Sequence, residues 1–155
     1  VRVLGDLNDE RIPSGLREVI ERLERESGGT GSGTAPADGE GNKLTLSIAI
    51  NYGGRKDILN ASKRMALALA EDESFDIDAI TEETFGSFLA TASLPPPDLL
   101  IRTSEARLSN FMLWDLAYTE IYFIDTLWPD FDEASLDDAL DWFRQRKRRF
   151  GARQA

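Results

Sequence analysis

The sequence predicts an α/β fold with a mainly parallel sheet flanked by helices, because short apolar runs alternate with stretches of helical periodicity. The runs at residues 44–50 and 98–102 are apolar enough to be strands covered on both faces. Residues 14–26 carry apolar side chains at helical spacing. Polar segments follow the two apolar runs directly, and parallel sheets bind ligands at the carboxyl ends of their strands.

In the first half of the chain, a short strand over residues 1–4 precedes the helix over roughly 14–26. The stretch at about 28–42 is rich in Gly, Ser, Ala and acids, so we expect a flexible insertion at the surface. The strand over 44–50 leads into the turn at 51–55, whose glycines allow close backbone approach. The helix that follows is marked by Ile58, Ala61, Met65 and Leu69.

In the second half, Thr81 can cap a short helix that holds Phe85, Phe88 and Leu89. Pro95 to Pro97 impose an extended lead-in to the strand over 98–102. We expect a helix over 110–118, a strand over 120–124 and a last helix that starts near 132–135. That helix has acids at its start and bases at its end, which suits the helix dipole. Its buried face is predicted to contain Leu136, Ala139, Leu140 and Phe143.

The composition narrows the chemistry that is open to the chain. It has no cysteine and no histidine, which excludes disulfides, thiolate zinc sites, cysteine nucleophiles and Ser-His-Asp triads. Acid–base or metal chemistry must therefore use carboxylates, which favour hard ions such as Mg²⁺. The net charge of −10 argues against a general nucleic-acid binder.

The segment from Arg102 to Asn110 has the residue types of an anion site. Arg102 and Arg107 follow a predicted strand and are accompanied by serine and threonine hydroxyls. Guanidinium groups present fixed N–H forks to phosphate oxygens, and hydroxyls add short neutral hydrogen bonds. These residues favour a phosphate or diphosphate ligand. Alternatively, the two arginines pair with local acids such as Asp98 and Glu105.

Other charged residues leave two interpretations open. Glu120 is flanked by side chains that favour burial, so its carboxylate must be paired, hydrogen-bonded or bound to metal. It is either a structural partner for an arginine or a metal ligand. The arginine-rich end at 144–149 is either a solvated helix end or an arm that binds an anion or anionic lipid headgroups. We interpret the aromatic turn at 128–132 as structural.

Several segments, taken in their order along the chain, form a wider pattern. They are Val-Arg-Val-Leu-Gly-Asp6, Asn-Tyr-Gly-Gly-Arg55, Leu-Leu-Ile-Arg-Thr-Ser104, Trp-Asp-Leu-Ala-Tyr-Thr-Glu-Ile-Tyr-Phe123, Asp-Thr-Leu-Trp-Pro-Asp-Phe131 and Arg-Arg-Phe-Gly151. In this order they resemble the cis-prenyltransferase family, and within it the undecaprenyl diphosphate synthases. The resemblance spans nearly the whole chain. It implies that residues 1–155 form the C-terminal part of a single cis-prenyltransferase domain.

The resemblance implies an activity and a set of site residues. Members of the family condense isopentenyl diphosphate with an allylic diphosphate such as farnesyl diphosphate, with Mg²⁺, and form polyprenyl diphosphates. Glu120 matches the carboxylate at the Mg²⁺ site, which reaches across the dimer interface in family members. The residues that match ligands of the isopentenyl diphosphate group are Arg102, Arg107, Leu108 and Ser109.

The resemblance also implies partners and a location. Arg149 and Gly151 match a tail that approaches the diphosphate site of a second subunit, and a homodimer is expected. We expect a cytoplasmic protein, and a long polyprenyl product is compatible with peripheral contact to a membrane surface. No nucleic-acid partner is expected.

The match departs from the family at three places. The family's N-terminal section, with an Asp-Gly-Asn-Gly-Arg-type loop that holds an Mg²⁺ ligand, has no counterpart. Since the chain opens on Val1 within strand-like sequence, we expect missing upstream residues and no activity of this chain alone. The family usually has a Gly between the positions of Ser104 and Glu105, and the Gly-rich insertion is longer than usual. The alternative is a non-catalytic subunit that binds and supports an active partner.

Overall fold

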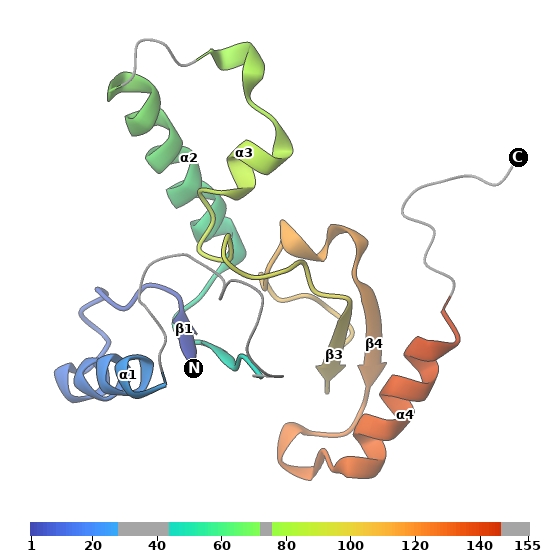
Figure 1. The fold of residues 1–155 in the computed structure, drawn as a ribbon. Helices are drawn as coiled ribbons and strands as arrows, with labels where there is room; N and C mark the ends of the chain where they lie inside the picture. The colour runs from blue at the N-terminus through green and yellow to red at the C-terminus, as the bar shows by residue number, and fades with distance from the viewer. Residues whose placement is uncertain (28–43, 72–75, 147–155) are drawn as a thin grey trace, which may run out of the picture. The chain divides into compact units, whose positions relative to one another are not determined.

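The computed structural model describes residues 1–27, 44–71 and 76–146, and the chain divides into two units, residues 1–95 and 96–155. Each unit contains one pair of parallel strands with helices beside it (Figure 1). The predicted α/β class and parallel pairing are confirmed, and the described strands form two two-stranded sheets where one sheet was expected. The insertion predicted at about 28–42 lies outside the described residues. No described helix is long and apolar enough to cross a membrane.

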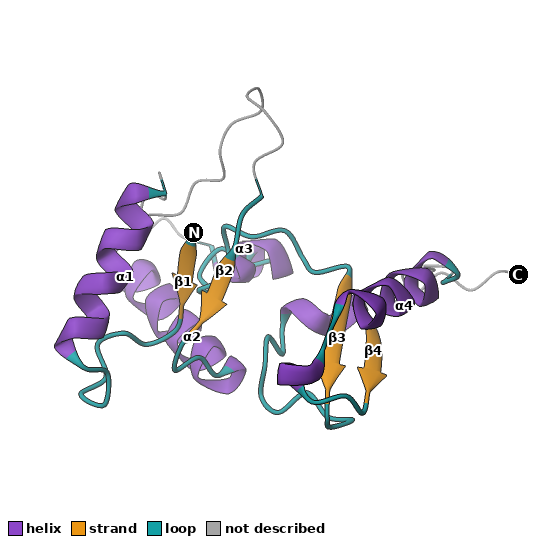
Figure 2. Cartoon of the chain, turned by 90° about the horizontal axis from the view of Figure 1, so that it is seen from below, coloured by secondary structure: helices purple, strands orange, loops and turns teal. Residues whose placement is uncertain are grey.

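The first unit pairs its two strands in parallel, with Val3 opposite Ile48. Helix α1 packs against β1, and α3 packs against α2. Figure 2 shows the two strands running side by side in the same direction, which brings their carboxyl ends together. The main elements are, in order, β1 (Arg2–Leu4), α1 (Ser14–Glu26), β2 (Ser47–Ala49), α2 (Gly54–Glu71) and α3 (Glu82–Gly86).

A close crossing at the carboxyl ends of β1 and β2 requires glycine. Gly5 has φ +128°, and a Cβ added there would lie 1.9 Å from the carbonyl oxygen of Ile50. In the turn after β2, the residue with positive φ is Asn51, at +52°. Asparagine tolerates this conformation, and its side-chain amide donates to the carbonyl oxygen of Asp6 at 3.0 Å.

Helix α2 is tied to the segment after α3 by a buried carboxylate. Asp57 is only 7% exposed and accepts hydrogen bonds from the backbone N–H of Ala90 at 2.9 Å and the hydroxyl of Tyr52 at 3.0 Å. The predicted cap of α3 is confirmed, because the backbone N–H of Thr84 donates to Thr81 Oγ1 at 3.1 Å. The helix ends at Gly86, so Phe88 and Leu89 lie in the turns beyond it.

The second unit pairs its strands over five residues in parallel register, from Leu99 opposite Glu120 to Thr103 opposite Ile124. Helix α4 packs against β4, where the rings of Tyr122 and Trp142 have centroids 5.2 Å apart. Its main elements are β3 (Leu99–Thr103), a 3-10 helix (Asp115–Tyr118), β4 (Glu120–Ile124) and α4 (Glu133–Arg144).

One predicted helix is largely wrong. Residues 110–118 were expected to be helical, but only the 3-10 turn at Asp115–Tyr118 forms. Asn110 and Met112 have φ of +64° and +41°, and left-handed residues interrupt a right-handed helix. The predicted start of α4 is confirmed, because Asp132 accepts a hydrogen bond from the backbone N–H of Ser135 at 2.9 Å.

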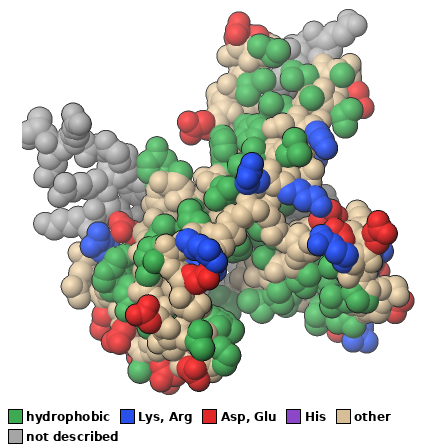
Figure 3. Space-filling model, turned by 180° about the vertical axis from the view of Figure 1, so that it is seen from behind, with side chains coloured by type: hydrophobic (Ala, Val, Ile, Leu, Met, Phe, Trp, Pro, Cys, Tyr) green, Lys and Arg blue, Asp and Glu red, His purple; other side chains and the backbone are tan. Residues whose placement is uncertain are grey.

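The strands are less covered than their apolar sequence predicted. Ile48 in β2 is 39% exposed, and every residue of β3 is half-buried. The core face of α4 buries Ala139, whereas Leu136 remains 40% exposed. Figure 3 shows apolar side chains reaching the surface on the face that it draws. A pair of strands has too little area to build a full core by itself, so an apolar run predicts a strand more reliably than it predicts what covers that strand.

We predict that Gly5→Ala destabilises the protein by about 3 kcal/mol or more, because the new methyl group overlaps the Ile50 carbonyl and alanine is strained at positive φ. Chemical denaturation followed by circular dichroism measures the change. Gly15→Ala is the matched control, since a Cβ there meets nothing within 4 Å. Equal stability of the two variants would contradict the close crossing.

Candidate functional site

A tight turn at the carboxyl end of β3 shapes the predicted anion segment. Ser104 has φ +63°, and the backbone N–H of Glu105 donates to the carbonyl oxygen of Thr103 at 2.8 Å. A hydrogen bond between residues two apart with positive φ between them defines a strained γ-turn. The backbone N–H of Ser104 also donates to the carbonyl oxygen of Ile124 at 2.8 Å, which anchors the turn to β4. The chain therefore turns sharply where β3 ends.

This turn brings together the polar residues that the sequence singled out. Arg102 Nη2 lies 3.1 Å from Ser109 Oγ and 3.3 Å from Glu105 Oε2. Arg107 donates through Nε and Nη2 to the two oxygens of Glu105, each at 2.8 Å. Leu108 is half-buried, and its carbonyl oxygen accepts from the backbone N–H of Phe111 at 3.1 Å. The alternative pairing of the arginines with Glu105 is thus present in the structure.

The charges of this cluster leave capacity for an anion. The two hydrogen bonds from Arg107 hold the pKa of Glu105 below its ordinary value, so its carboxylate is ionised at neutral pH. Two arginines and one glutamate leave one net positive charge. In addition, Arg102 Nε is buried and has no hydrogen-bond partner among the residues that the structure describes. An unsatisfied guanidinium N–H costs free energy that an anionic oxygen would recover.

Glu120 lies away from this cluster, at the opposite end of the strand pair. It begins β4 opposite Leu99, four residues before the position opposite Thr103, which at ~3.3 Å per residue is roughly 13 Å along the strand. Its carboxylate accepts from Arg146 Nε at 3.2 Å, and Arg146 also lies 4.9 Å from the centre of the Trp142 ring. The interpretation of Glu120 as a partner for an arginine therefore describes this structure.

As a metal ligand, Glu120 would not belong to a larger cluster of ligands within the described residues. The described ranges contain no group of three or more acidic, histidine or cysteine side chains that could hold a metal ion. Mg²⁺ is commonly held by one or two carboxylates, with water and substrate phosphates supplying the remaining ligands. A single carboxylate that is 24% exposed therefore fits one position of such a shell. Arg149 and Gly151 lie outside the part of the chain that the structure describes.

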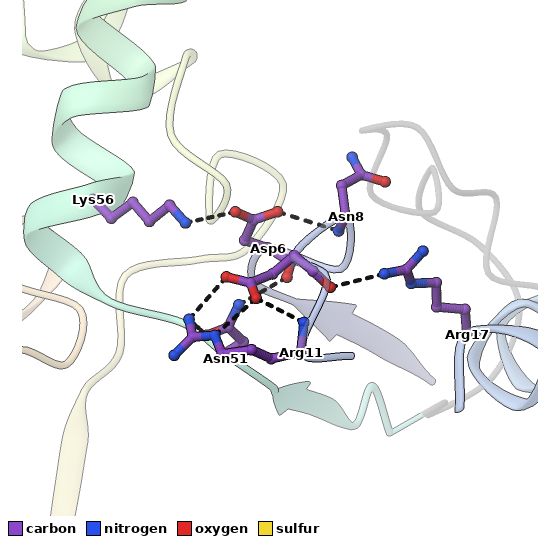
Figure 4. A network of polar contacts seen from close by, with 7 residues as sticks. Asp6, Asn8, Arg11, Arg17, Asn51 and Lys56 are labelled. Atoms are coloured by element: carbon purple, nitrogen blue, oxygen red, sulfur yellow. Dashed lines mark hydrogen bonds and ion pairs between the residues drawn. The ribbon is translucent and has the colours of Figure 1, made fainter. Parts of the chain in front are cut away.

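A second polar cluster, which sequence reasoning did not find, occupies the carboxyl ends of β1 and β2 (Figure 4). Lys56 pairs with Asp6 at 2.6 Å, and Arg11 donates to both oxygens of Asp9 at 2.8 Å. These partners hold the pKa values of Asp6 and Asp9 below the ordinary range. The cluster borders a cleft of about 340 Å³. The sequence already pointed to the segment at 51–55 after β2, and the meeting of parallel strand ends extends this signal to the charged residues after β1.

We interpret this second cluster as structural. Asp6 is paired with Lys56 and Asp9 with Arg11, all within the first unit. The side-chain amide of Asn51 donates to the backbone carbonyl of Asp6, just after β1. The Asp6–Lys56 pair fastens the segment after β1 to the start of α2, whereas the Asp9–Arg11 pair lies within that segment. The arginine cluster after β3 differs because both of its arginines bond to a single carboxylate, that of Glu105. A buried guanidinium N–H without a partner among the described residues occurs in both clusters, at Arg102 Nε and at Arg17 Nε.

Comparison with known proteins gives a consistent result. The family model described as "Putative undecaprenyl diphosphate synthase" matches residues 1–151. An isoprenyl transferase of Ralstonia nicotianae is 42% identical over 158 residues, covering 100% of this chain and 54% of that protein. A ditrans,polycis-undecaprenyl-diphosphate synthase of Coxiella burnetii, specific for (2E,6E)-farnesyl diphosphate, is 55% identical over 109 residues, covering 70% of this chain and 46% of that protein.

Solved structures agree with the sequence matches. Lavandulyl diphosphate synthase from Lavandula x intermedia, in complex with dimethylallyl diphosphate, superposes with a TM-score of 0.83 at 38% identity, over 97% of this chain and 59% of that one. A probable undecaprenyl diphosphate synthase from Campylobacter jejuni superposes with a TM-score of 0.71 at 33% identity, over 97% and 62%. The chain spans about half the length of the related sequences that it matches.

We predict that Arg107→Ala raises the pKa of Glu105 toward its ordinary value, because the hydrogen bonds from Arg107 are the largest cause of its lowering. Carboxyl chemical shifts followed by NMR during an acid titration measure this pKa. Arg144→Ala, which removes an exposed partner of Asp141, is the control and leaves the Glu105 titration unchanged. An unaltered pKa of Glu105 in Arg107→Ala would show that the pair does not form in solution.

Proposed function

The chain belongs to the prenyltransferase family of the undecaprenyl diphosphate synthases, and from this membership we propose that it binds isopentenyl diphosphate for cis-prenyl transfer. In the proposed reaction, isopentenyl diphosphate is condensed with an allylic diphosphate such as farnesyl diphosphate to give a polyprenyl diphosphate. The observation that carries the proposal is the arginine cluster after β3. There, the buried and unpartnered Nε of Arg102 lies in the same cluster as Ser109 and Arg107.

The proposed ligand matches the chemistry of that cluster. A diphosphate carries several anionic oxygens, and each can accept from a guanidinium fork or a hydroxyl. Arg102 offers Nε and Nη2 on one edge, Arg107 offers a second fork, and Ser109 offers its hydroxyl. The names of two relatives support an isoprenoid diphosphate as the class of ligand. One relative is specific for farnesyl diphosphate, and the other was solved in complex with dimethylallyl diphosphate.

We also propose that the working protein is a homodimer that uses Mg²⁺. Within one chain, Glu120 and the arginine cluster lie at opposite ends of the β3–β4 pair. A second copy is the simplest source of a carboxylate for each diphosphate site. When bound, Mg²⁺ would neutralise charge on a departing diphosphate. Exposed aromatic side chains, such as Trp128 at 72% exposure, support the further proposal of peripheral contact with a membrane surface.

We predict that Arg102→Ala weakens binding of isopentenyl diphosphate by at least about tenfold, because charge-assisted hydrogen bonds from its fork are lost. Isothermal titration calorimetry on the protein measures the affinity. Arg144→Ala is the matched control, because its exposed guanidinium pairs with Asp141, three residues earlier on α4, and lies outside the arginine cluster. If Arg102→Ala and Arg144→Ala bind the ligand as tightly as the unmodified protein, the proposed site is wrong.

For the metal, we predict opposite effects of two substitutions. Glu120→Gln should weaken Mg²⁺ binding in the presence of isopentenyl diphosphate, since a neutral amide is a poorer ligand for a hard cation. Arg146→Ala should strengthen it modestly, by up to about fivefold, because the competing partly exposed ion pair is worth little. Calorimetric titration with Mg²⁺ tests both. Glu133→Gln is the control, and a loss equal to that of Glu120→Gln would remove Glu120 from the metal site.

A further inference from the structure

The arginine cluster after β3 already holds an anion of its own. We propose that Glu105 is an internal competitor whose carboxylate occupies the diphosphate site in the free protein and must leave before a diphosphate binds. This inference rests on the proposed function of the same cluster, and it concerns what sets the affinity there. In this role Glu105 opposes ligand binding instead of contributing to it.

The hydrogen bonds of Glu105 show why both anions cannot be held in the same way. Its two oxygens accept hydrogen bonds from Nε and Nη2 of Arg107, each at 2.8 Å. These two nitrogens form one complete edge of the guanidinium group. Oε2 also takes Nη2 of Arg102 at 3.3 Å. A planar carboxylate and a phosphate group use this edge in the same bidentate geometry. A diphosphate that binds the Arg107 fork must therefore replace Glu105.

The tight turn at Ser104 explains how Glu105 reaches the arginines. The positive φ of Ser104 and the 2.8 Å hydrogen bond from Glu105 N–H to Thr103 O reverse the chain within three residues. The backbone N–H of Ser104 is held by Ile124 O, so the turn is fixed on β4. Glu105 lies three residues after Arg102 and two before Arg107 in the sequence. The turn brings its carboxylate back toward both arginines, and it bonds to each of them.

The exposure of the pair makes exchange feasible. The side chains of Glu105 and Arg107 are 43% and 70% exposed, so water can solvate each partner after they separate. Exposed ion pairs contribute little free energy, and a diphosphate brings more negative charge than one carboxylate. With Glu105 neutralised, the net charge of the cluster would rise from one to two positive charges. Both changes favour the incoming anion.

The test uses inorganic diphosphate as the probe, without Mg²⁺ and at low salt, with binding measured by calorimetry. We expect Glu105→Gln to bind diphosphate roughly 1.5-fold to fivefold more tightly than the unmodified protein, which is the range that release of an exposed ion pair allows. Glu133→Gln, at the exposed start of α4, removes the same charge elsewhere and should change affinity little. Equal thermal unfolding of both variants confirms that each is folded.

A second variant keeps the carboxylate and moves it. Insertion of one glycine between Ser104 and Glu105 relaxes the turn, so it should also tighten diphosphate binding.

In the unmodified protein, NMR titration should show the pKa of Glu105 rising when diphosphate is added, because the bonds from Arg107 are lost.

The outcomes separate the two proposals. If the unmodified protein binds diphosphate and Glu105→Gln binds it equally or less tightly, Glu105 does not compete and this inference is overturned. If neither protein binds diphosphate and Arg102→Ala is indistinguishable from them, the proposed function of the cluster fails, and the competitor fails with it. Tighter binding by Glu105→Gln but not by Glu133→Gln supports both.

Discussion

The parallel register of β3 and β4 determines where the charged groups of the second unit can meet. Thr103 lies opposite Ile124, and the next residue, Ser104, is hydrogen-bonded to that strand end. The turn that gathers the two arginines therefore has a fixed base. The same register places Glu120 opposite Leu99, at the other end of the pair. A shift of the pairing by one residue would reverse the faces of β4 and break the anchor of the turn.

Both sets of candidate ligands are paired with groups of opposite charge. Arg107 holds Glu105, and Arg146 holds Glu120. A protein that binds a highly charged substrate together with a cation must keep these groups soluble and ordered in the absence of either. Exposed ion pairs achieve this at low cost, because the partners can be replaced without leaving a buried charge. Under the proposed function, binding of substrate and of metal would be exchange reactions, and their affinities would depend on the groups displaced as well as on the ligands.

Local patterns predicted much of the fold and part of the site. The sequence predicted the periodicity of α1 and α2, the cap at Thr81, the start of α4 near residue 132 and the arginines that follow β3, because each depends on residues close in sequence. The partner of Glu120 was not readable, since Arg146 lies 26 residues away. The helix expected over 110–118 failed because positive φ values at individual residues have no strong sequence signal outside glycine. The prediction that the strands are covered on both faces was wrong, because an apolar sequence does not show which elements pack against a strand.

Burial separates the carboxylates that fasten the fold from those that can exchange partners. Asp57 is 7% exposed and accepts from a backbone N–H and a tyrosine hydroxyl. Removing it would leave buried donors unsatisfied, so its bonds are permanent parts of the first unit. Glu105 is far more exposed, and its partners are side chains that water or an anion can satisfy equally well. A carboxylate can therefore either fasten the fold, as Asp57 does, or exchange partners, as we propose for Glu105. The free-energy cost of leaving its partner unpaired decides between the two.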